Sequence, residues 1–325
     1  MEKIKFLTMA ALATAFFASC SNEDGLPQSN YPADNVVRIT TSVDGMNTRA
    51  SYGGSTAKLS SFGFCINNAG SDKYTYDNIK VTQENGKWNP ATQMLWQNST
   101  TAVDILAYAP YQANGNVKIF GKSDYAFSVK ADQSNAEDYL SDLIVYKQTG
   151  FTPGSELNTS KAVDVAFTHL LSQLNLTIEL RDQFNQDEKK PVTEATVTDV
   201  KVNGTIISSK VDFSASPISV QVDDTQEATA ITPETTEFKA AGKTTDHAAF
   251  NYSAIVIPQT VTAGNFSISF KVDGTDYIWT STSDVNFVSG NKHQLSLLVG
   301  KDVVQVKGIT ATPWGKENIT QGETD

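Results

Sequence analysis

Hydrophobic and polar residues alternate with a period of two along most of the chain after residue 35. Because successive side chains of a β-strand point to opposite faces of a sheet, this period predicts short strands with one buried face. Many of the apolar positions hold β-branched or aromatic residues, which strands favour. The clearest segments are 36–43, 102–107, 174–180, 197–202, 206–213, 218–222, 252–257, 266–272 and 293–299.

Turn sequences separate these segments and predict how they are connected. The dipeptides Asp44-Gly45, Asn85-Gly86, Asn203-Gly204 and Asp273-Gly274 are typical of tight hairpin turns. Many short strands with regular turns favour sandwiches over one large barrel, so we predict an all-β chain. We further predict a helical turn at 135–140, a helical start at 167–173 and a long loop at 223–246.

The length of 325 residues suits two domains of about 150 residues each. Gly150, Pro153 and Gly154, followed by a polar stretch, interrupt the strand pattern between 148 and 165. We therefore predict an N-terminal sandwich at 36–165 and a C-terminal sandwich at 166–325.

The N-terminus has the pattern of a bacterial lipoprotein signal. Lys3 and Lys5 precede an apolar run from 6 to 18, and the small residues Ala18 and Ser19 lead directly into Cys20. This run is shorter than the roughly 20 apolar residues that span a bilayer, so it is interpreted as a cleaved signal peptide, residues 1–19. Cys20 would then carry acyl chains such as palmitate and anchor the protein to a membrane. The alternative is ordinary secretion with an incidental cysteine.

The residues after Cys20 favour a position outside the cell. Residues 21–25, SNEDG, resemble the acidic tag of lipoproteins on the outer face of the outer membrane. Residues 20–35 contain two prolines and are predicted to form a flexible tether.

Charge and cysteine content narrow the function classes. The net charge is −11, and removal of Glu2, Lys3 and Lys5 with the signal leaves 23 basic and 35 acidic residues, about −12. Nucleic acid is excluded as a partner because phosphate binding requires a basic face. Cys65 is then the sole thiol apart from Cys20, and its apolar surroundings predict a buried, inert side chain.

Candidate chemistry is scarce. The three histidines, at 169, 247 and 293, have no metal-ligand spacing, and neither a Gly-x-Ser-x-Gly elbow nor a phosphate-binding glycine loop occurs. We expect no metal, no cofactor and no enzymatic activity. The tryptophans at 88, 96, 279 and 314 serve either as core residues, which we favour, or as stacking platforms for sugars.

Several segments together resemble the fimbrillin family of Bacteroides and Porphyromonas, in particular its shorter Mfa-like members. They are the lipoprotein signal, 39–50 ending in NTRA, 105–111 (ILAYAPY), 167–178 (FTHLLSQLNLTI) and 309–314 (ITATPW). The resemblance implies two transthyretin-like β-sandwich domains and a role in building surface fimbriae. It also implies that an arginine-specific surface protease cuts the lipidated precursor and that the first strand then leaves.

That assembly route maps onto particular residues of this sequence. A cut between Arg49 and Ala50 would remove the lipid, the tether and a first strand containing Val36, Val37, Ile39, Thr41 and Val43. The exposed groove and strand edge would be repaired by a strand from another subunit. The candidate donor is the segment 303–312, VVQVKGITAT, which alternates at Val304 and Val306 and then has Ile309.

Head-to-tail addition of this kind gives an open filament. The expected partners are other fimbrial subunits, the outer membrane through the lipid, the protease and a host or bacterial surface ligand. Two alternatives remain open in the sequence: an anchor that keeps its lipid, and a surface glycan-binding lipoprotein of a nutrient-uptake system.

Overall fold

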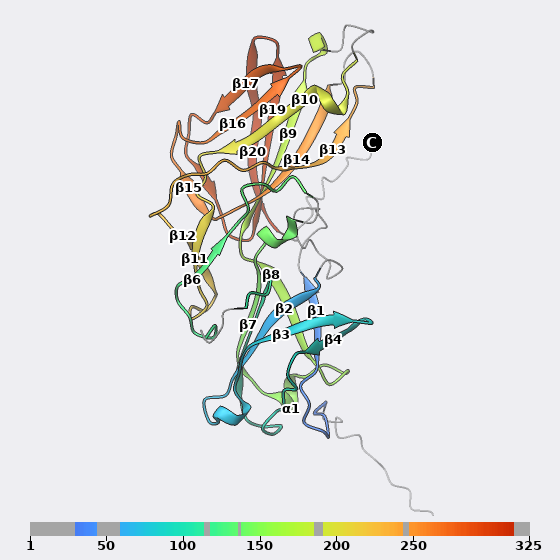
Figure 1. The fold of residues 1–325 in the computed structure, drawn as a ribbon, viewed down its shortest axis with the longest axis vertical. Helices are drawn as coiled ribbons and strands as arrows, with labels where there is room; N and C mark the ends of the chain where they lie inside the picture. The colour runs from blue at the N-terminus through green and yellow to red at the C-terminus, as the bar shows by residue number, and fades with distance from the viewer. Residues whose placement is uncertain are drawn as a thin grey trace, which may run out of the picture.

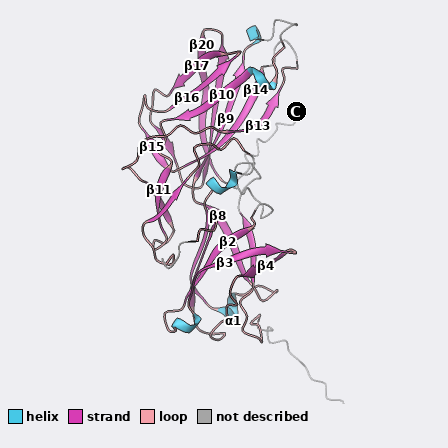
Figure 2. Cartoon of the chain, viewed as in Figure 1, coloured by secondary structure: helices cyan, strands magenta, loops and turns pink. Residues whose placement is uncertain are grey.

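The computed structural model describes residues 30–43, 59–113, 118–135, 138–184, 191–242 and 247–314. The predicted signal peptide, Cys20, Arg49 and Ala50 lie outside the described residues. The described part consists almost wholly of strands arranged in several sheets, which confirms the all-β prediction (Figure 2). Within it, no helix has the length and apolar character needed to span a membrane.

The strands and helical turns have the following bounds. In the first half of the chain the strands are β1 (Ile39–Val43), β2 (Ser61–Asn67), β3 (Tyr76–Glu84), β4 (Lys87–Pro90), β5 (Val103–Ala109), β6 (Tyr125–Ser128), β7 (Ile144–Phe151) and β8 (Val163–His169). In the second half they are β9 (Ser172–Leu180), β10 (Val197–Asn203), β11 (Ser208–Asp212), β12 (Ser219–Val222), β13 (Glu234–Lys239), β14 (Ala248–Val256), β15 (Gln259–Val261), β16 (Ser267–Val272), β17 (Thr275–Thr280), β18 (Val285–Phe287), β19 (Asn291–Gly300) and β20 (Val303–Pro313). The helical turns are α1 (Pro153–Glu156), η2 (Asp72–Tyr74), η3 (Asp138–Ser141), η4 (Asp182–Phe184) and η5 (Glu194–Thr196).

A seven-stranded sheet forms the lower part of the elongated molecule in Figure 1, with the strand order β1-β8-β7-β5-β2-β3-β4. Its pairs are antiparallel except for β1 and β8, which run parallel. The predicted Asn85-Gly86 turn joins β3 to β4, and both residues have the positive φ (52° and 73°) that such a hairpin turn requires. Strands β1 and β4 are therefore the two ends of this sheet.

The upper part of the molecule contains a five-stranded sheet in the order β13-β14-β9-β19-β20, with β9 and β19 parallel (Figure 1). Smaller sheets accompany it: β10-β16-β17, β12-β11-β6 and β15-β18. Apolar residues from these sheets share one core, as expected for sheets packed in sandwich fashion.

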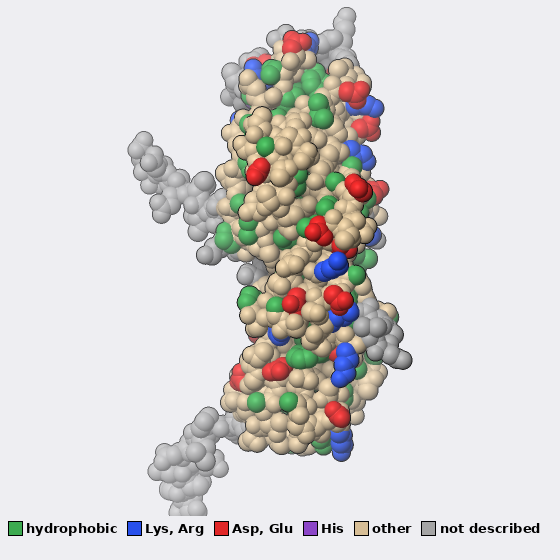
Figure 3. All heavy atoms as spheres, turned by 90° about the vertical axis from the view of Figure 1, so that its left-hand side faces the viewer, with side chains coloured by type: hydrophobic (Ala, Val, Ile, Leu, Met, Phe, Trp, Pro, Cys, Tyr) green, Lys and Arg blue, Asp and Glu red, His purple; other side chains and the backbone are tan. Residues whose placement is uncertain are grey.

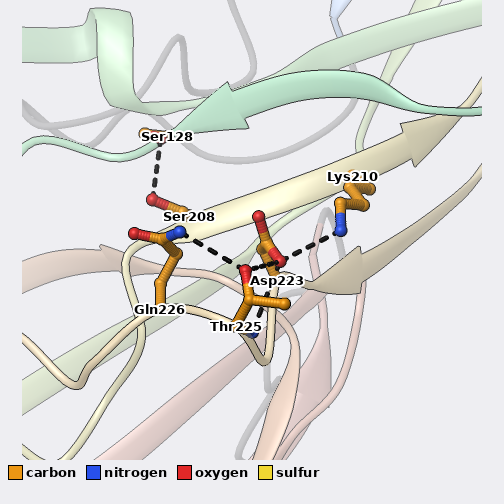
Figure 4. A network of polar contacts seen from close by, with 6 residues as sticks. All are labelled: Ser128, Ser208, Lys210, Asp223, Thr225 and Gln226. Atoms are coloured by element: carbon orange, nitrogen blue, oxygen red, sulfur yellow. Dashed lines mark hydrogen bonds and ion pairs between the residues drawn. The ribbon is translucent and has the colours of Figure 1, made fainter.

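The small sheet β12-β11-β6 joins strands from distant parts of the chain. Strand β6 pairs antiparallel with β11, more than 80 residues later, and Ser128 bonds to Ser208 through their hydroxyl oxygens at 3.1 Å. Figure 4 shows this contact beside the ion pair of Lys210 with Asp223 (3.0 Å), and Asp223 also accepts a hydrogen bond from Thr225. Strand β6 is thus tied to the second half of the chain.

Two apolar clusters make up the core. One includes Phe62, Phe64, Ile105, Phe151 and Phe167 of the seven-stranded sheet and the end strand β1. The other combines the opposite face of that sheet with the remaining sheets; examples are Leu106, Tyr108, Phe127, Phe250 and Leu297. The centre of the seven-stranded sheet is therefore buried on both faces, which explains the continuous apolar runs of β2 and β5.

Cys65 is buried and free, as predicted. Its burial raises the pKa of the thiol well above its usual value, because the thiolate would be desolvated. The backbone N–H of Asn78 points at its Sγ at 3.2 Å.

Two local predictions are wrong. The segment 167–173 has no helical start, because Phe167 and His169 continue the buried positions of β8 and Ser172 begins β9. At Leu170 and Leu171 the chain passes from the seven-stranded sheet, which contains β8, to the five-stranded sheet, which contains β9. The division into two domains stays a prediction. The segment 223–246, predicted to be a long loop, contains strand β13, which pairs with β14. Phe238 is the one large apolar residue of this strand. The predicted turn at 135–140 overlaps η3.

Candidate functional site: the edge strands β1 and β20

Strand β1 lies at the edge of the seven-stranded sheet with β8 as its sole strand neighbour among the described residues. In their parallel register, Ile39 is opposite Val163 and Val43 is opposite Phe167. The ladder contains five residue pairs, so β1 is held by a short set of main-chain hydrogen bonds on one side. Figure 1 shows it next to β8, with β3 and β4 nearby.

Four of the five predicted first-strand residues, at positions 37, 39, 41 and 43, alternate along the chain and lie on its core-facing side, and Val36 is out of phase with them. Val37, Ile39 and Val43 are buried, whereas Val36 and Thr41 are half-buried. Beside β1, the register partners Val163, Val165 and Phe167 of β8 have fully buried side chains. The Phe167 ring contacts Phe62 edge to face, with 5.4 Å between centroids. Strand β1 therefore covers an apolar surface that would otherwise meet water.

The residues just before β1 attach it to the segment after β4. The N–H of Val37 donates to the carbonyl of Met94 (3.0 Å), and the N–H of Trp96 donates to the carbonyl of Asn35 (2.8 Å). Arg38 forms an exposed ion pair with Asp34 at 2.6 Å, and its hydrogen bond lowers the pKa of that carboxyl to about 2. Exposed pairs of this kind add little to stability.

A groove of about 900 Å³ runs between β1 and the β3–β4 hairpin. The residues preceding and forming β1 line one side, and Lys87, Trp88 and Pro90 of β4 line the other. Ser160 and Ala162, which precede β8, also line it. Its charged lining residues are Arg38 and Lys87, both basic. We call this feature the seam groove.

Strand β20, the predicted donor, is the edge strand of the five-stranded sheet. It forms ten residue pairs with β19, and a bulge at Lys307 interrupts their register. Because of the bulge, Val304, Val306 and Ile309 lie opposite the buried residues Val299, Leu297 and Leu295, all on the core-facing side. Yet Val306 and Ile309 are 46% and 45% exposed. The apolar side chains on this side of β20 are therefore only partly covered.

Side-chain contacts also hold β20 in place. Lys307 forms an ion pair with Glu179 at 2.8 Å. At the end of the strand, the N–H of Trp314 donates to the carbonyl of Gly290 (2.7 Å), and its ring stacks on His169 with centroids 3.9 Å apart. Nδ1 of His169 lies 2.9 Å from the carboxylate of Asp142, and both side chains are buried. Trp314 thus attaches the last strand to the end of β8.

Exposed apolar side chains concentrate on β20 and its neighbour β17. Ile278, Val303, Val306 and Ile309 are four of the six large apolar residues found exposed in the described part of the chain. A shallow groove of about 380 Å³, lined by Trp279, Val304 and Ile309 among others, separates the two strands. Apolar surface of this kind on edge strands marks a region suited to pairing with another chain.

The histidines have structural contacts. Nε2 of His293 accepts the N–H of Val288 (3.1 Å), and burial lowers the pKa of this histidine. In the described residues, no three His, Cys, Asp or Glu side chains are grouped to hold a metal ion. Trp96 and Trp314 are buried, and Trp88 and Trp279 are half-buried against the two cores, as core residues are.

Two parts of this site were not predictable from the sequence. The Asn85-Gly86 dipeptide marks the β3–β4 hairpin, but nothing in the sequence indicates that β4 lies across a groove from β1. The stacking of Trp314 on His169 joins residues 145 positions apart, and neither belongs to a recognisable local motif.

The described residues form an all-β architecture whose edge strands β1 and β20 carry apolar side chains, which defines the protein by its fold as an all-β protein built from packed sheets. The family comparison agrees. The fimbrillin-like family model matches residues 48–314, and the chain belongs to that family. Membership supports a structural role in fimbriae at the cell surface.

Solved structures show the same fold at low sequence identity. A candidate cell adhesion protein from Bacteroides ovatus ATCC 8483 has a TM-score of 0.61 at 13% identity, with 87% of this chain and 99% of that chain covered. One from Bacteroides uniformis ATCC 8492 gives 0.56 at 20% identity, with the same coverage. A fimbrial protein from Bacteroides vulgatus ATCC 8482 gives 0.52 at 15% identity, with 85% and 99% covered. No curated protein sequence matches the chain.

Proposed function

We propose that this protein is a structural subunit of surface fimbriae that contributes to adhesion and assembles by donor-strand addition. It is exported as a lipoprotein acylated at Cys20 and reaches the outer face of the outer membrane. An arginine-specific protease then cuts between Arg49 and Ala50. The observation that carries the proposal is the position of β1, an edge strand paired on one side whose apolar residues cover part of the core.

The position of Arg49 makes β1 separable from the rest of the chain. Arg49 follows Val43, the last residue of β1, by six positions, so a cut there divides the chain between β1 and β2. The detached segment would be held by five ladder pairs and a few contacts of residues 34–40. Its departure would expose Val163, Val165 and Phe167 and leave the edge of β8 unpaired, both costly in water.

An added strand from a second subunit repairs both losses. In β1 and the residues just before it, the core-facing positions 37, 39, 41 and 43 are spaced by two. Val304 and Val306 of β20 have the same spacing, and the bulge at Lys307 places Ile309 on the same face. Release of β20 from its own sheet requires breaking its ladder with β19 and unstacking Trp314, whereas Val306 and Ile309 are already half-exposed.

The direct test is the substitution R49A, with R38A as a matched control in the same leader segment. We expect R49A to remain uncleaved and monomeric on treatment with an arginine-specific protease, whereas R38A and the unaltered protein are cut and form filaments visible by electron microscopy. Filaments formed by R49A at the normal rate would refute the proposed assembly route.

The N-terminal residue of protein recovered from cells separates a subunit from an anchor. Ala50 at the N-terminus of filament protein indicates a polymerised subunit. Lipidated Cys20 at the base of filaments indicates a membrane-retained anchor that keeps β1 in its own sheet.

A further inference from the structure

The bulge at Lys307 divides strand β20 into two halves that are held differently. The half 303–306 pairs with 297–300 of β19, and the half 308–313 pairs with 291–296. Three side-chain contacts hold the first half and its two ends: Arg181 donates to the side-chain oxygen of Gln305, the Tyr277 hydroxyl donates to the carbonyl of Lys301 (3.1 Å), and Lys307 forms an ion pair with Glu179 (2.8 Å). The first half is therefore tied to β17 and to the end of β9.

The second half of β20 has fewer attachments. Among residues 308–313 only Thr312 is half-buried, and the others are exposed. Their side chains form no hydrogen bond or ion pair within the described part of the chain. In Figure 3, hydrophobic side chains reach the surface of the upper part of the molecule, the part that contains β17 and β20 in Figure 1. The ladder with β19 and the next residue, Trp314, therefore hold this half in its sheet.

Trp314 is the buried end of the weakly attached half. It is 6% exposed, and its indole lies nearly parallel to the imidazole of His169, with 5° between the ring planes. The Lys292 ammonium lies 5.7 Å from the indole centroid, within the range of a cation–π contact. Asp142 orients the imidazole through Nδ1. Ring contacts and the main-chain bond to Gly290 thus hold Trp314.

Two buried nitrogens in this stack have no hydrogen-bond partner among the described residues. They are Nε1 of Trp314 and Nε2 of His169. A buried polar atom without a partner lowers stability, and water supplies the missing hydrogen bond once the atom is exposed. Departure of Trp314 from the stack would therefore recover part of what the lost ring contacts contribute.

Gly308 gives the second half of β20 a point about which to move. Lys307 has no partner in the ladder with β19, and a Cβ placed on Gly308 would meet no atom within 4 Å. Glycine has more backbone freedom than other residues, and a bulge interrupts the ladder locally. An opening of β20 that starts at Trp314 would therefore stop at 307–308.

We propose that Trp314 is a latch that keeps β20 in its own sheet. When Trp314 leaves His169, β20 opens from its C-terminal end as far as the bulge, while 303–306 stays paired. Asp142 and His169 are positioning residues for this latch. The inference rests on the proposed donor role of β20 and gives the first step of its release. Because His169 ends β8, the partner of β1, the closed latch fastens the donor strand to the strand of the acceptor edge.

Hydrogen exchange of the uncleaved chain, followed by mass spectrometry, tests the latch without any assembly. The substitution W314L keeps an apolar side chain but removes the ring stack. We expect it to speed exchange of the amides of 308–312 about tenfold and to change those of 304–306 less than about twofold. W314F keeps a ring that can stack on His169, so it should have a smaller effect than W314L.

W96L is the matched control for W314L. Trp96 is also buried and stacks on an aromatic ring, that of Phe151 with 5.7 Å between centroids, but it belongs to the other core cluster. It should leave the exchange of 308–312 unchanged relative to 304–306. A second variant, G308V, tests the hinge without touching the stack. Valine fits the open space and favours extended backbone, so it should slow exchange of 309–312 about two- to fivefold.

The outcomes separate the latch from the proposed function. Equal acceleration of both halves of β20 in W314L, or the same change in W96L, would overturn the latch, because Trp314 would then act only through general stability. Unchanged exchange of 308–312 in both W314L and G308V would also overturn it. Filament formation by the cleaved, otherwise unaltered protein is measured separately. Its absence would refute donor-strand assembly and leave the exchange result for the latch standing.

Discussion

At the scale of single residues, Lys147 joins parts of the molecule that are distant in sequence. Its Nζ donates to the carbonyl oxygens of Phe213 (2.8 Å), Ser214 (2.9 Å) and Ala215 (2.8 Å). Burial lowers the pKa of this lysine, because its ammonium group is partly desolvated. The three carbonyl groups replace the lost water.

The substitution K147M should therefore destabilise the protein. It keeps the aliphatic stem but leaves the three carbonyls without their donor, and we expect a loss of about 1–3 kcal/mol in the free energy of unfolding. Urea denaturation measures this, with K118M as the exposed control. Equal stability of the two variants would show that water donates to the three carbonyl groups as well as Lys147 does.

His293 should make stability depend on pH. Burial lowers its pKa in the folded protein below the unfolded value of about 6.5, so the unfolded state binds the proton more readily. The contribution of neutral His293 to the free energy of unfolding is complete above about pH 6.5, and it is lost as the pH falls through the pKa of the folded protein. The largest slope from one such group is about 1.4 kcal/mol per pH unit.

Denaturation curves between pH 7 and pH 5 test this effect. The unaltered protein should lose stability over that range, and H293Q, which keeps an acceptor for the N–H of Val288 but does not titrate, should lose less. Asp34 has a pKa lowered to about 2 and titrates below this window. Identical pH profiles for the two proteins would contradict a role for His293.

At the scale of elements, β1 should open more readily than the central strands. It has one neighbour and five ladder pairs, whereas β9 has nine pairs with β14 and eight with β19. Local opening then costs less than global unfolding. In hydrogen exchange followed by mass spectrometry, we expect amides of 39–43 to exchange well before those of 172–180. Equal protection of both segments would mean that β1 separates only with the whole fold, against the proposed route.

Elements with a strong local pattern were predictable from the sequence, and elements defined by distant partners were not. The alternation in 36–43 and the Asp273-Gly274 turn, which joins β16 to β17, identify strands and a hairpin directly. Strand β13 is polar at most positions, and its pairing with β14 outweighs its composition. The bulge at Lys307 explains why Val304, Val306 and Ile309 share a face despite their uneven spacing.

At the scale of the whole molecule, the two halves of the sequence share a core. Leu106 and Tyr108 of the seven-stranded sheet belong to the same apolar cluster as Phe250 and Leu297 of the five-stranded sheet. Strand β6 adds to this connection, because its strand partner in the described structure is β11. Sequence periodicity predicts individual strands but not their packing partners. The predicted boundary near 165 therefore gives no sign that strands from the two halves of the sequence pack into one core.

Separating the chain at the change of sheet tests how far the halves depend on each other. A fragment of residues 30–171 would expose Tyr125 and Phe127 of β6, and one of 172–314 would leave β11 with an unpaired edge and lose the His169–Trp314 stack. We expect both fragments to be aggregation-prone or to lack a cooperative thermal transition, whereas the intact chain unfolds in one. Mixing the fragments during refolding should restore part of the transition, because the missing partners are then present. Two fragments that each unfold cooperatively as soluble monomers would show that the shared cluster contributes little, and that the halves are independent domains.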